Sequence, residues 1–316
     1  MIIGNAQEYE KCFKASDFYI FAIGYEHRSF YLLDYLLERF PLAKKLIFLL
    51  NDYTKYPHVV EKVAQLREKN IHFHEVDYLD GAIIQTIISD TVSLIKNEEK
   101  SISIHIDYSS MPRSWYCNMP ITLSEVISED DIVYFWYSEG EYPDSHEEYP
   151  SAGIDSFSLF SGKPSLRIDG DRIHVLALGY DLIRTQAILS ITDPNYLVSC
   201  MAYDPKRKGF LKSLRDVNVS VLARSAMTLS LHVDDFEFMV SKMCETANEL
   251  VSTGDVILIP DGPKPLIFAM SLVPYLLNKV GITCLHITRN KEHFSAVDVE
   301  PTGVVCGFKV QKKKRV

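Results

Sequence analysis

The sequence predicts an α/β protein made of two tandem units, each with a mainly parallel sheet, related by internal duplication. Two observations predict this fold class. Short apolar runs rich in β-formers alternate along the chain with segments whose apolar residues recur at helical spacing. The same short motifs also occur twice, once in each half. Because 316 residues exceed the usual size of one domain, we expect two domains, spanning residues 1–168 and 169–316.

The first half alternates strand and helix signals. The expected strands are 18–23, 45–50, 71–76, 101–107 and 132–136. The expected helices are 29–40, 57–69, 82–96 and 114–128. Buried strands separated by helices are typical of a parallel sheet covered on both faces. Residues 156–166 are expected to form a hairpin that leads out of this half.

The second half repeats this alternation. The expected strands are 172–178, 196–201, 217–223, 256–260, 283–287 and 297–310. The expected helices are 182–191, 234–250 and 265–280. We therefore expect both units to have a Rossmann-like arrangement of strands and helices.

Three pairs of motifs at nearly constant spacing indicate the duplication. They are Ala22–Glu26 with Ala177–Asp181, Asp52 with Asp204, and Pro112-Arg113 with Pro263-Lys264, at offsets of 155, 152 and 151 residues. Each pair follows the same expected strand of its half. The alternative is that two unrelated open α/β sheets share these spacings by chance.

Composition narrows the classes of function. The net charge is −9, and residues 1–150 hold 25 of the 42 acidic residues but 13 of the 33 basic ones. An acidic chain is unsuited to coating duplex DNA, because phosphate neutralisation supplies most of that affinity. No run approaches about 20 apolar residues, and the first residues lack an apolar signal core, so we expect no membrane partner and a cytoplasmic location. The six cysteines form no CxxC pair and are expected to be reduced thiols.

The unusual residues fall in loops after the first and fourth strands of each half. With strand order 3-2-1-4-5 these two strands are neighbours, and ligands bind in the crevice outside their carboxyl ends. The candidate ligand-binding residues of the first half are Gly24, Tyr25, Arg28, Asp52, Ser109, Ser110 and Arg113. Those of the second half are Gly179, Tyr180, Asp204, Asp261, Gly262, Lys264 and Arg289.

These residue types suit a ligand that carries phosphate. Arginines at positions 28 and 113 can bind phosphate oxygens through paired hydrogen bonds, and Lys264 can do so as a point charge. The loops run into helix N-termini, where backbone N–H groups attract anions. The glycines let a backbone approach the ligand closely, and the serines add hydroxyl donors. Asp52 and Asp204 stand where an acidic residue meets a ribose hydroxyl.

Several of these residues have an alternative role. Tyr25 and Tyr180 either stack on a base or pack on the first helix of their unit. Arg28 either binds phosphate or pairs with an acid such as Glu26. Asp107 either takes part in chemistry or caps the turn that follows it. Neither GxGxxG nor GxxxxGK[ST] occurs, so a standard dinucleotide or Walker site is not indicated, and we expect no cofactor.

The loop after the fourth strand carries a family resemblance. Asp107-Tyr108-Ser109-Ser110-Met111-Pro112-Arg113 resembles the D-x-[ST]-G-G-[ST]-K loop of CARF domains, the CRISPR-associated Rossmann-like sensors. Asp261-Gly262-Pro263-Lys264-Pro265-Leu266 resembles the G-G-T-K-P-M form of that loop, and two fused units of this kind also resemble SAVED sensors. The first loop departs from the pattern because Ser110-Met111 replaces a glycine pair. The resemblance implies binding of a cyclic oligoadenylate, and it allows a homodimer.

Three hypotheses of function follow. The first is a nucleotide sensor, with a cyclic oligonucleotide as candidate ligand, in a prokaryotic antiviral or stress system, acting through a separate effector protein. The alternative is an enzyme of nucleotide metabolism, a phosphodiesterase or transferase using His27, Asp107 and Arg113. The third is a scaffold whose ancestral site has decayed. The sequence shows no grouped metal ligands, so we expect no metal and a slow, metal-independent turnover if there is any.

Overall fold

The computed structural model describes residues 1–141, 151, 153–165, 170–207, 209–290 and 297–313. The chain divides into one unit of residues 1–144 with 296–316 and a second unit of residues 145–295. The boundary expected at 168/169 falls outside the described residues. The division differs from two consecutive halves because the last strand, expected in the second unit, pairs within the first sheet.

The first sheet has seven described strands in the order β1-β13-β6-β5-β2-β3-β4. They are β1 (Ile2–Asn5), β2 (Phe18–Ile23), β3 (Lys44–Leu50), β4 (His74–Val76), β5 (Ser103–Asp107), β6 (Ile132–Glu141) and β13 (Glu300–Gln311). The five strands from β6 to β4 are parallel, as expected. Strand β13 runs antiparallel to both β6 and β1.

The second sheet has six described strands in the order β10-β9-β8-β11-β12-β7. They are β7 (Phe157–Lys163), β8 (Asp171–Ala177), β9 (Tyr196–Tyr203), β10 (Met227–His232), β11 (Gly254–Ile259) and β12 (Ile282–Ile287). Instead of the hairpin expected at 156–166, β7 is a single edge strand antiparallel to β12. The other neighbours are parallel.

Helices connect the strands of both units. In the first unit they are α1 (Tyr9–Cys12), η1 (His27–Phe30), α2 (Tyr31–Arg39), η2 (Tyr53–Lys55), α3 (Pro57–Glu68), α4 (Gly81–Glu98), α5 (Arg113–Tyr116) and α6 (Met119–Val126). In the second they are α7 (Leu182–Thr192), α8 (Phe210–Val217), α9 (Val219–Leu222), α10 (Phe236–Leu250) and α11 (Lys264–Leu277). No helix in the described ranges has the length and apolarity needed to cross a membrane.

The strand expected at 217–223 was wrong. Residues Val219–Leu222 are helical, and the strand at this place in the sheet is β10. Val221 of this helical turn is buried in the core. Asn218 starts that turn, and its buried side-chain amide donates to the carbonyl oxygens of Gly179 and Leu214.

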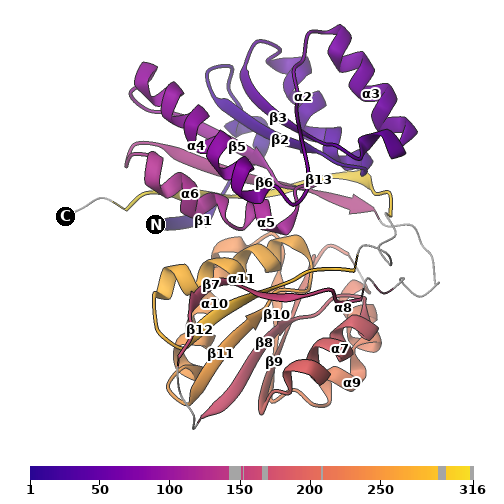
Figure 1. Cartoon of the computed structure of the whole chain (residues 1–316), viewed down its shortest axis with the longest axis vertical. Helices are drawn as coiled ribbons and strands as arrows, with labels where there is room; N and C mark the ends of the chain where they lie inside the picture. Colours follow the sequence, from indigo (N-terminus) through magenta and orange to yellow (C-terminus); the bar gives the residue numbers. More distant parts are fainter. Residues whose placement is uncertain (142–150, 152, 166–169, 208, 291–296, 314–316) are drawn as a thin grey trace. The chain divides into compact units, whose positions relative to one another are not determined.

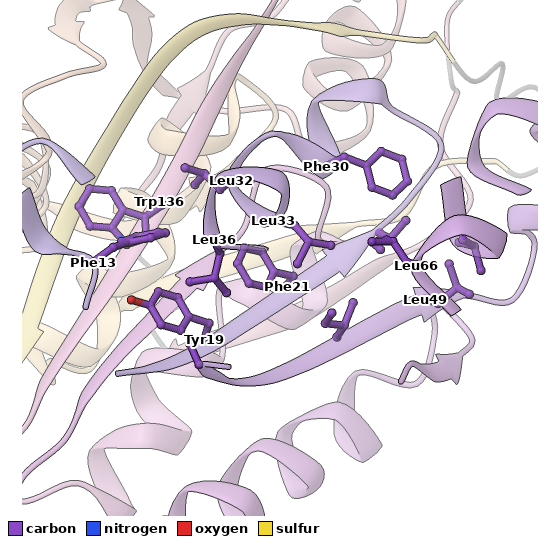
Figure 2. Close-up of a cluster of buried hydrophobic side chains, with 14 of the residues drawn as sticks. Phe13, Tyr19, Phe21, Phe30, Leu32, Leu33, Leu36, Leu49, Leu66 and Trp136 are labelled. Atoms are coloured by element: carbon purple, nitrogen blue, oxygen red, sulfur yellow. The ribbon is translucent and has the colours of Figure 1, made fainter. Parts of the chain in front are cut away.

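The core of the first unit lies on both faces of its sheet. All six residues of β2 are buried, which requires cover on each side. Tyr19 and Phe21 pack against Leu33 and Leu36 of α2, and Figure 2 shows these side chains together. Helices α4 and α6 cover the other face (Figure 1). This cover leaves the ends of the strands as the places where loops can form a site.

The two sheets share one topology. Read from β4, the first sheet runs β4-β3-β2-β5-β6-β13, and the second runs β10-β9-β8-β11-β12-β7, each with an antiparallel sixth strand. Gly24 and Gly179 follow the equivalent strands β2 and β8, as the duplication predicts. In the first unit this antiparallel strand is β13, near the end of the chain. In the second unit it is β7, the first strand of that unit. In both units the strand order reverses between the first and fourth parallel strands.

Candidate functional site

The candidate site lies where the strand order reverses. Strand β2 pairs with β5, and β8 pairs with β11, so the loops that follow these strands start side by side in each unit. In the second unit these loops contact one another: a β-carbon added at Gly179 would lie 3.2 Å from the carbonyl oxygen of Asp261, and one at Gly262 would lie 3.0 Å from that of Leu178. The close approach that requires these glycines is therefore between two loops of the protein.

Arg28 is an internal ion-pair partner. Its side chain is 1% exposed, and its Nε and Nη2 donate to the two carboxylate oxygens of Glu26 at 2.9 and 3.1 Å. Its Nη1 donates to the hydroxyl of Tyr137 and to the carbonyl oxygen of Ser138, both in β6. The structure therefore shows the alternative role, pairing with Glu26. Arg28 therefore links the loop after β2 to β6, which lies on the far side of β5 in the sheet.

The second unit contains a matching arginine that the sequence analysis missed. Arg184 is also 1% exposed, and its Nε lies 3.0 Å from both carboxylate oxygens of Asp261. It donates to the carbonyl oxygen of Ile287 at the end of β12 and to that of Gly153. Its spacing of 156 residues from Arg28, close to the offset of 155 for the preceding motif, is the signal that would have found it.

Asp107 shapes its own loop. Its Oδ1 accepts from the backbone N–H of Ser109 at 2.9 Å and from the Ser109 hydroxyl. The Ser109 oxygen in turn accepts from the backbone N–H of Ser138 at 2.8 Å. Asp107 and Ser109 are buried, whereas Ser110 is half-buried and donates to Glu26. The capping role is the one that the structure shows for Asp107.

The tyrosines predicted to stack on a base and the aspartates predicted to bind a ribose contact other residues of their own unit. The Tyr25 ring lies 5.5 Å from that of Tyr56, and the Tyr180 ring 5.7 Å from that of Phe210. Burial raises the pKa of Tyr180, which keeps its phenol neutral. Asp52 pairs with Lys55 at 3.7 Å, and the Asp204 carboxylate accepts from the backbone N–H of Lys206. Their roles toward a ligand stay predictions.

Three predicted cations follow the strands on either side of the reversal point or the strand next to it. Arg113 is the first residue of α5, and Lys264 is the first residue of α11; both are half-buried. Arg289 is exposed and follows β12. Arg113 and Lys264 stand at equivalent points of the two units, directly after a proline.

The structure also brings together a group that the sequence analysis did not find. His27 Nδ1 lies 2.7 Å from a carboxylate oxygen of Asp298 and 3.4 Å from one of Glu300. The His58 ring stacks on the His27 ring at 4.0 Å with an interplanar angle of 13°. Asp298 stands 271 residues after His27, so no local spacing could reveal the group. This grouping removes the reason for expecting only metal-independent chemistry.

Comparison with known proteins adds little to this geometry. The sequence matches no family model, and it matches no curated protein. Among solved structures it is similar to a putative universal stress protein from Pseudomonas aeruginosa UCBPP-PA14, with 10% identity and a TM-score of 0.23, over 87% of this chain and 94% of that one. The cytoplasmic domain of a prokaryotic cation chloride cotransporter has 10% identity and a TM-score of 0.21, over 88% and 97% of the two chains. Similarity at these TM-scores carries no argument about function.

Proposed function

We propose that this protein binds a nucleotide at the carboxyl edge of its parallel strands and acts as a sensor for a separate effector protein. The observation that carries this proposal is the equivalent placement of Arg113 and Lys264. Each begins the helix after the fourth parallel strand, and each is half-buried beside the point where the strand order reverses. Ligands of open α/β sheets bind at this point.

The N-terminus of α11 supports the proposal. Its N-cap, Pro263, has no side-chain acceptor, so it cannot cap the helix as Asp181 caps α7 by accepting from the backbone N–H of Arg184 at 2.9 Å. A helix N-terminus whose N-cap side chain cannot accept a hydrogen bond can receive an external anion. Lys264 adds a positive charge at the same place. In the second unit we therefore assign the phosphate to α11 and not to α7.

The CARF-like and SAVED-like resemblance supplies the finer part of the proposal. It implies a cyclic oligonucleotide as ligand and a role in an antiviral or stress response of a prokaryote. The loop of the first unit differs from the family pattern because Met111 is buried and Ser110 donates to Glu26. Side chains thus fill a position that a glycine pair would leave open to phosphate. We expect the second unit to be the stronger of the two binding sites.

Calorimetric titration with linear and cyclic nucleotides tests the proposal. Arg113→Ala and Lys264→Ala should each weaken binding by about 1.5–3 kcal/mol, as expected for the loss of a charge-assisted hydrogen bond. Lys242→Ala is the matched control, since Lys242 is a surface residue of α10 paired with Glu245. Equal affinity in the parent and both variants would contradict the proposal. Chromatography of the nucleotides after incubation separates the hypotheses, because turnover would favour the enzyme.

A further inference from the structure

We propose that His27, His58 and Asp298, with Glu300 as a fourth ligand, form a binding site for a divalent transition-metal ion of the zinc class. One ligand atom from each of the first three residues lies within 4.8 Å of the other two. Ligands of a tetrahedral zinc ion stand about 3.4 Å apart, so the site closes around a metal once the stacked imidazole rings of His27 and His58 turn until their nitrogen lone pairs converge. This inference does not rest on the proposed nucleotide function.

Three separate elements fix the ligands in place. His27 begins η1 directly after β2, and its backbone N–H donates to the Asp298 carboxylate at 3.1 Å. The N–H of Arg28 donates to the carbonyl oxygen of the fully buried Val299, which anchors the segment that leads into β13. His58 lies in the first turn of α3. The fold therefore brings together ligands that are far apart in the sequence.

The hydrogen bonds prepare the histidines for a metal. His58 Nε2 lies 2.8 Å from the carbonyl oxygen of Tyr25, which can only accept, so Nε2 donates this hydrogen bond and Nδ1 is the nitrogen left to bind a metal. An N–H donated to a backbone carbonyl is the usual outer support of a metal-binding histidine. His27 Nδ1 and the Asp298 carboxylate, 2.7 Å apart, share the proton of a hydrogen bond. Metal binding would displace that proton, as it generally does at histidine and carboxylate ligands.

The charge around the group favours a cation. His27, His58 and Glu300 line a hollow of about 540 Å³ on the surface of the first unit. The same hollow is lined by three more carboxylates, those of Asp34, Glu38 and Glu61, and by the ammonium of Lys62, which pairs with Asp34 at 2.7 Å. An anion would meet net repulsion here, whereas a divalent cation would be attracted. Two imidazoles select a transition metal over Mg²⁺ or Ca²⁺, which prefer oxygen ligands.

Zinc binding by the full chain without an affinity tag tests the site. After chelator treatment and dialysis, the parent should bind one Zn²⁺ per chain in a competition assay with a zinc dye. His58→Gln and Asp298→Asn should each weaken binding by at least about tenfold. His72→Gln is the matched control, because His72 is an exposed histidine of the same unit outside the group, and it should bind as the parent does.

Two further measurements check that each variant folds and that the metal is bound by the proposed ligands. Circular dichroism of each variant in chelator shows whether it folds. The parent loaded with Co²⁺ should show the intense visible absorption of a four-coordinate ion with nitrogen and oxygen ligands. A parent spectrum like that of hydrated Co²⁺, or folded ligand variants that bind Zn²⁺ as tightly as the parent, would overturn the proposal.

Discussion

Arg28 and Arg184 show how one buried side chain can organise a whole strand edge. Each lies in the helix after the first parallel strand, pairs with a carboxylate, and donates to a carbonyl oxygen of the fifth strand. Both side chains are 1% exposed. An ion buried in this way needs every donor satisfied, because desolvation is costly. The pairs therefore fix the geometry on which any ligand site at this edge depends.

Removing one member of a pair should be strongly destabilising. Arg28→Met leaves the Glu26 carboxylate buried without its partner, so we expect a loss of about 3–5 kcal/mol in the free energy of unfolding. The double variant Glu26→Gln with Arg28→Met should be less destabilised than Arg28→Met alone. Arg172→Ala, which breaks an exposed pair with Asp193, is the control and should cost no more than about 1 kcal/mol. Urea unfolding measures all four proteins; equal losses for the buried and exposed arginines would contradict the role of burial.

His174 gives the second unit a dependence on pH. Its Nδ1 lies 3.2 Å from the Thr192 hydroxyl, which itself donates to Ile188, and its Nε2 is buried without a partner among the described groups. Burial lowers the pKa of His174 to about 4, from 6.5. Between these values, as the pH falls, the unfolded chain takes up a proton that the folded chain does not. Stability from this residue is thus complete above pH 6.5 and is lost toward pH 4.

Substitution of His174 by glutamine should remove that loss. Lowering the pH from 7 to 5 should destabilise the parent by about 2 kcal/mol more than His174→Gln, since a difference of one in pKa corresponds to about 1.4 kcal/mol. Urea unfolding at the two pH values makes the comparison. His72→Gln, at an exposed position, should keep the pH dependence of the parent. A variant whose pH dependence equals that of the parent would show that other groups cause it.

The residue types in the loops indicated which chemical roles they could have, but they did not indicate which residues they would contact. Arg28 and Asp107 were recognised as unusual, and the alternatives kept for each, an ion pair and a turn cap, are what the structure shows. Arg184 and Asp298 were missed because their partners stand 77 and 271 residues away along the chain. Charge and hydrogen-bonding capacity belong to a residue, whereas burial and partnership depend on the complete fold.

Strands and helices with a strong apolar pattern were predicted well. Strands β2, β3, β5, β8, β9, β11 and β12 lie within three residues of the expected bounds. Edge strands were harder, because an isolated β segment does not specify its neighbour. The pattern at 297–310 indicated a strand but not that β13 would insert between β1 and β6. The strand expected at 217–223 contains a helix, and the strand of this part of the sheet, β10, follows it at Met227–His232.

Gly307 allows β13 to approach β6 closely. A β-carbon at Gly307 would lie 2.4 Å from a ring carbon of Trp136 and 2.9 Å from the carbonyl oxygen of Phe135. Gly307→Ala should therefore destabilise the protein by about 1–3 kcal/mol through overpacking. Val304→Ala on the exposed part of the same strand is the control. Thermal unfolding followed by tryptophan fluorescence makes the comparison, and equal midpoints for the parent and Gly307→Ala would contradict the close contact.

At the scale of the molecule, the second unit is an insertion between β6 and β13 of the first. The second unit is continuous in sequence, so a chain of residues 145–295 should fold by itself. Residues 1–144 lack β13 and should fold poorly. Joining 1–144 to 297–316 through a short glycine-serine linker should restore folding.

Tryptophan fluorescence reports whether the first unit folds, because both tryptophans, Trp115 and Trp136, lie in this unit and are buried. The emission of residues 1–144 alone should shift to longer wavelength, as that of exposed indole does. The linked chain should emit as the full protein does. A native spectrum from residues 1–144 alone would show that β13 is dispensable.

The late position of β13 also sets an order of events during translation. When residue 141 leaves the ribosome, β6 is complete but the strand that pairs with one of its edges has not been made. At about 5–20 residues per second, the ribosome needs roughly 8–30 s to reach β13. An open strand edge invites pairing with other chains, so this interval is the time of greatest exposure to aggregation and the natural time for a chaperone to act. The second unit is finished during the same interval, although its synthesis begins later.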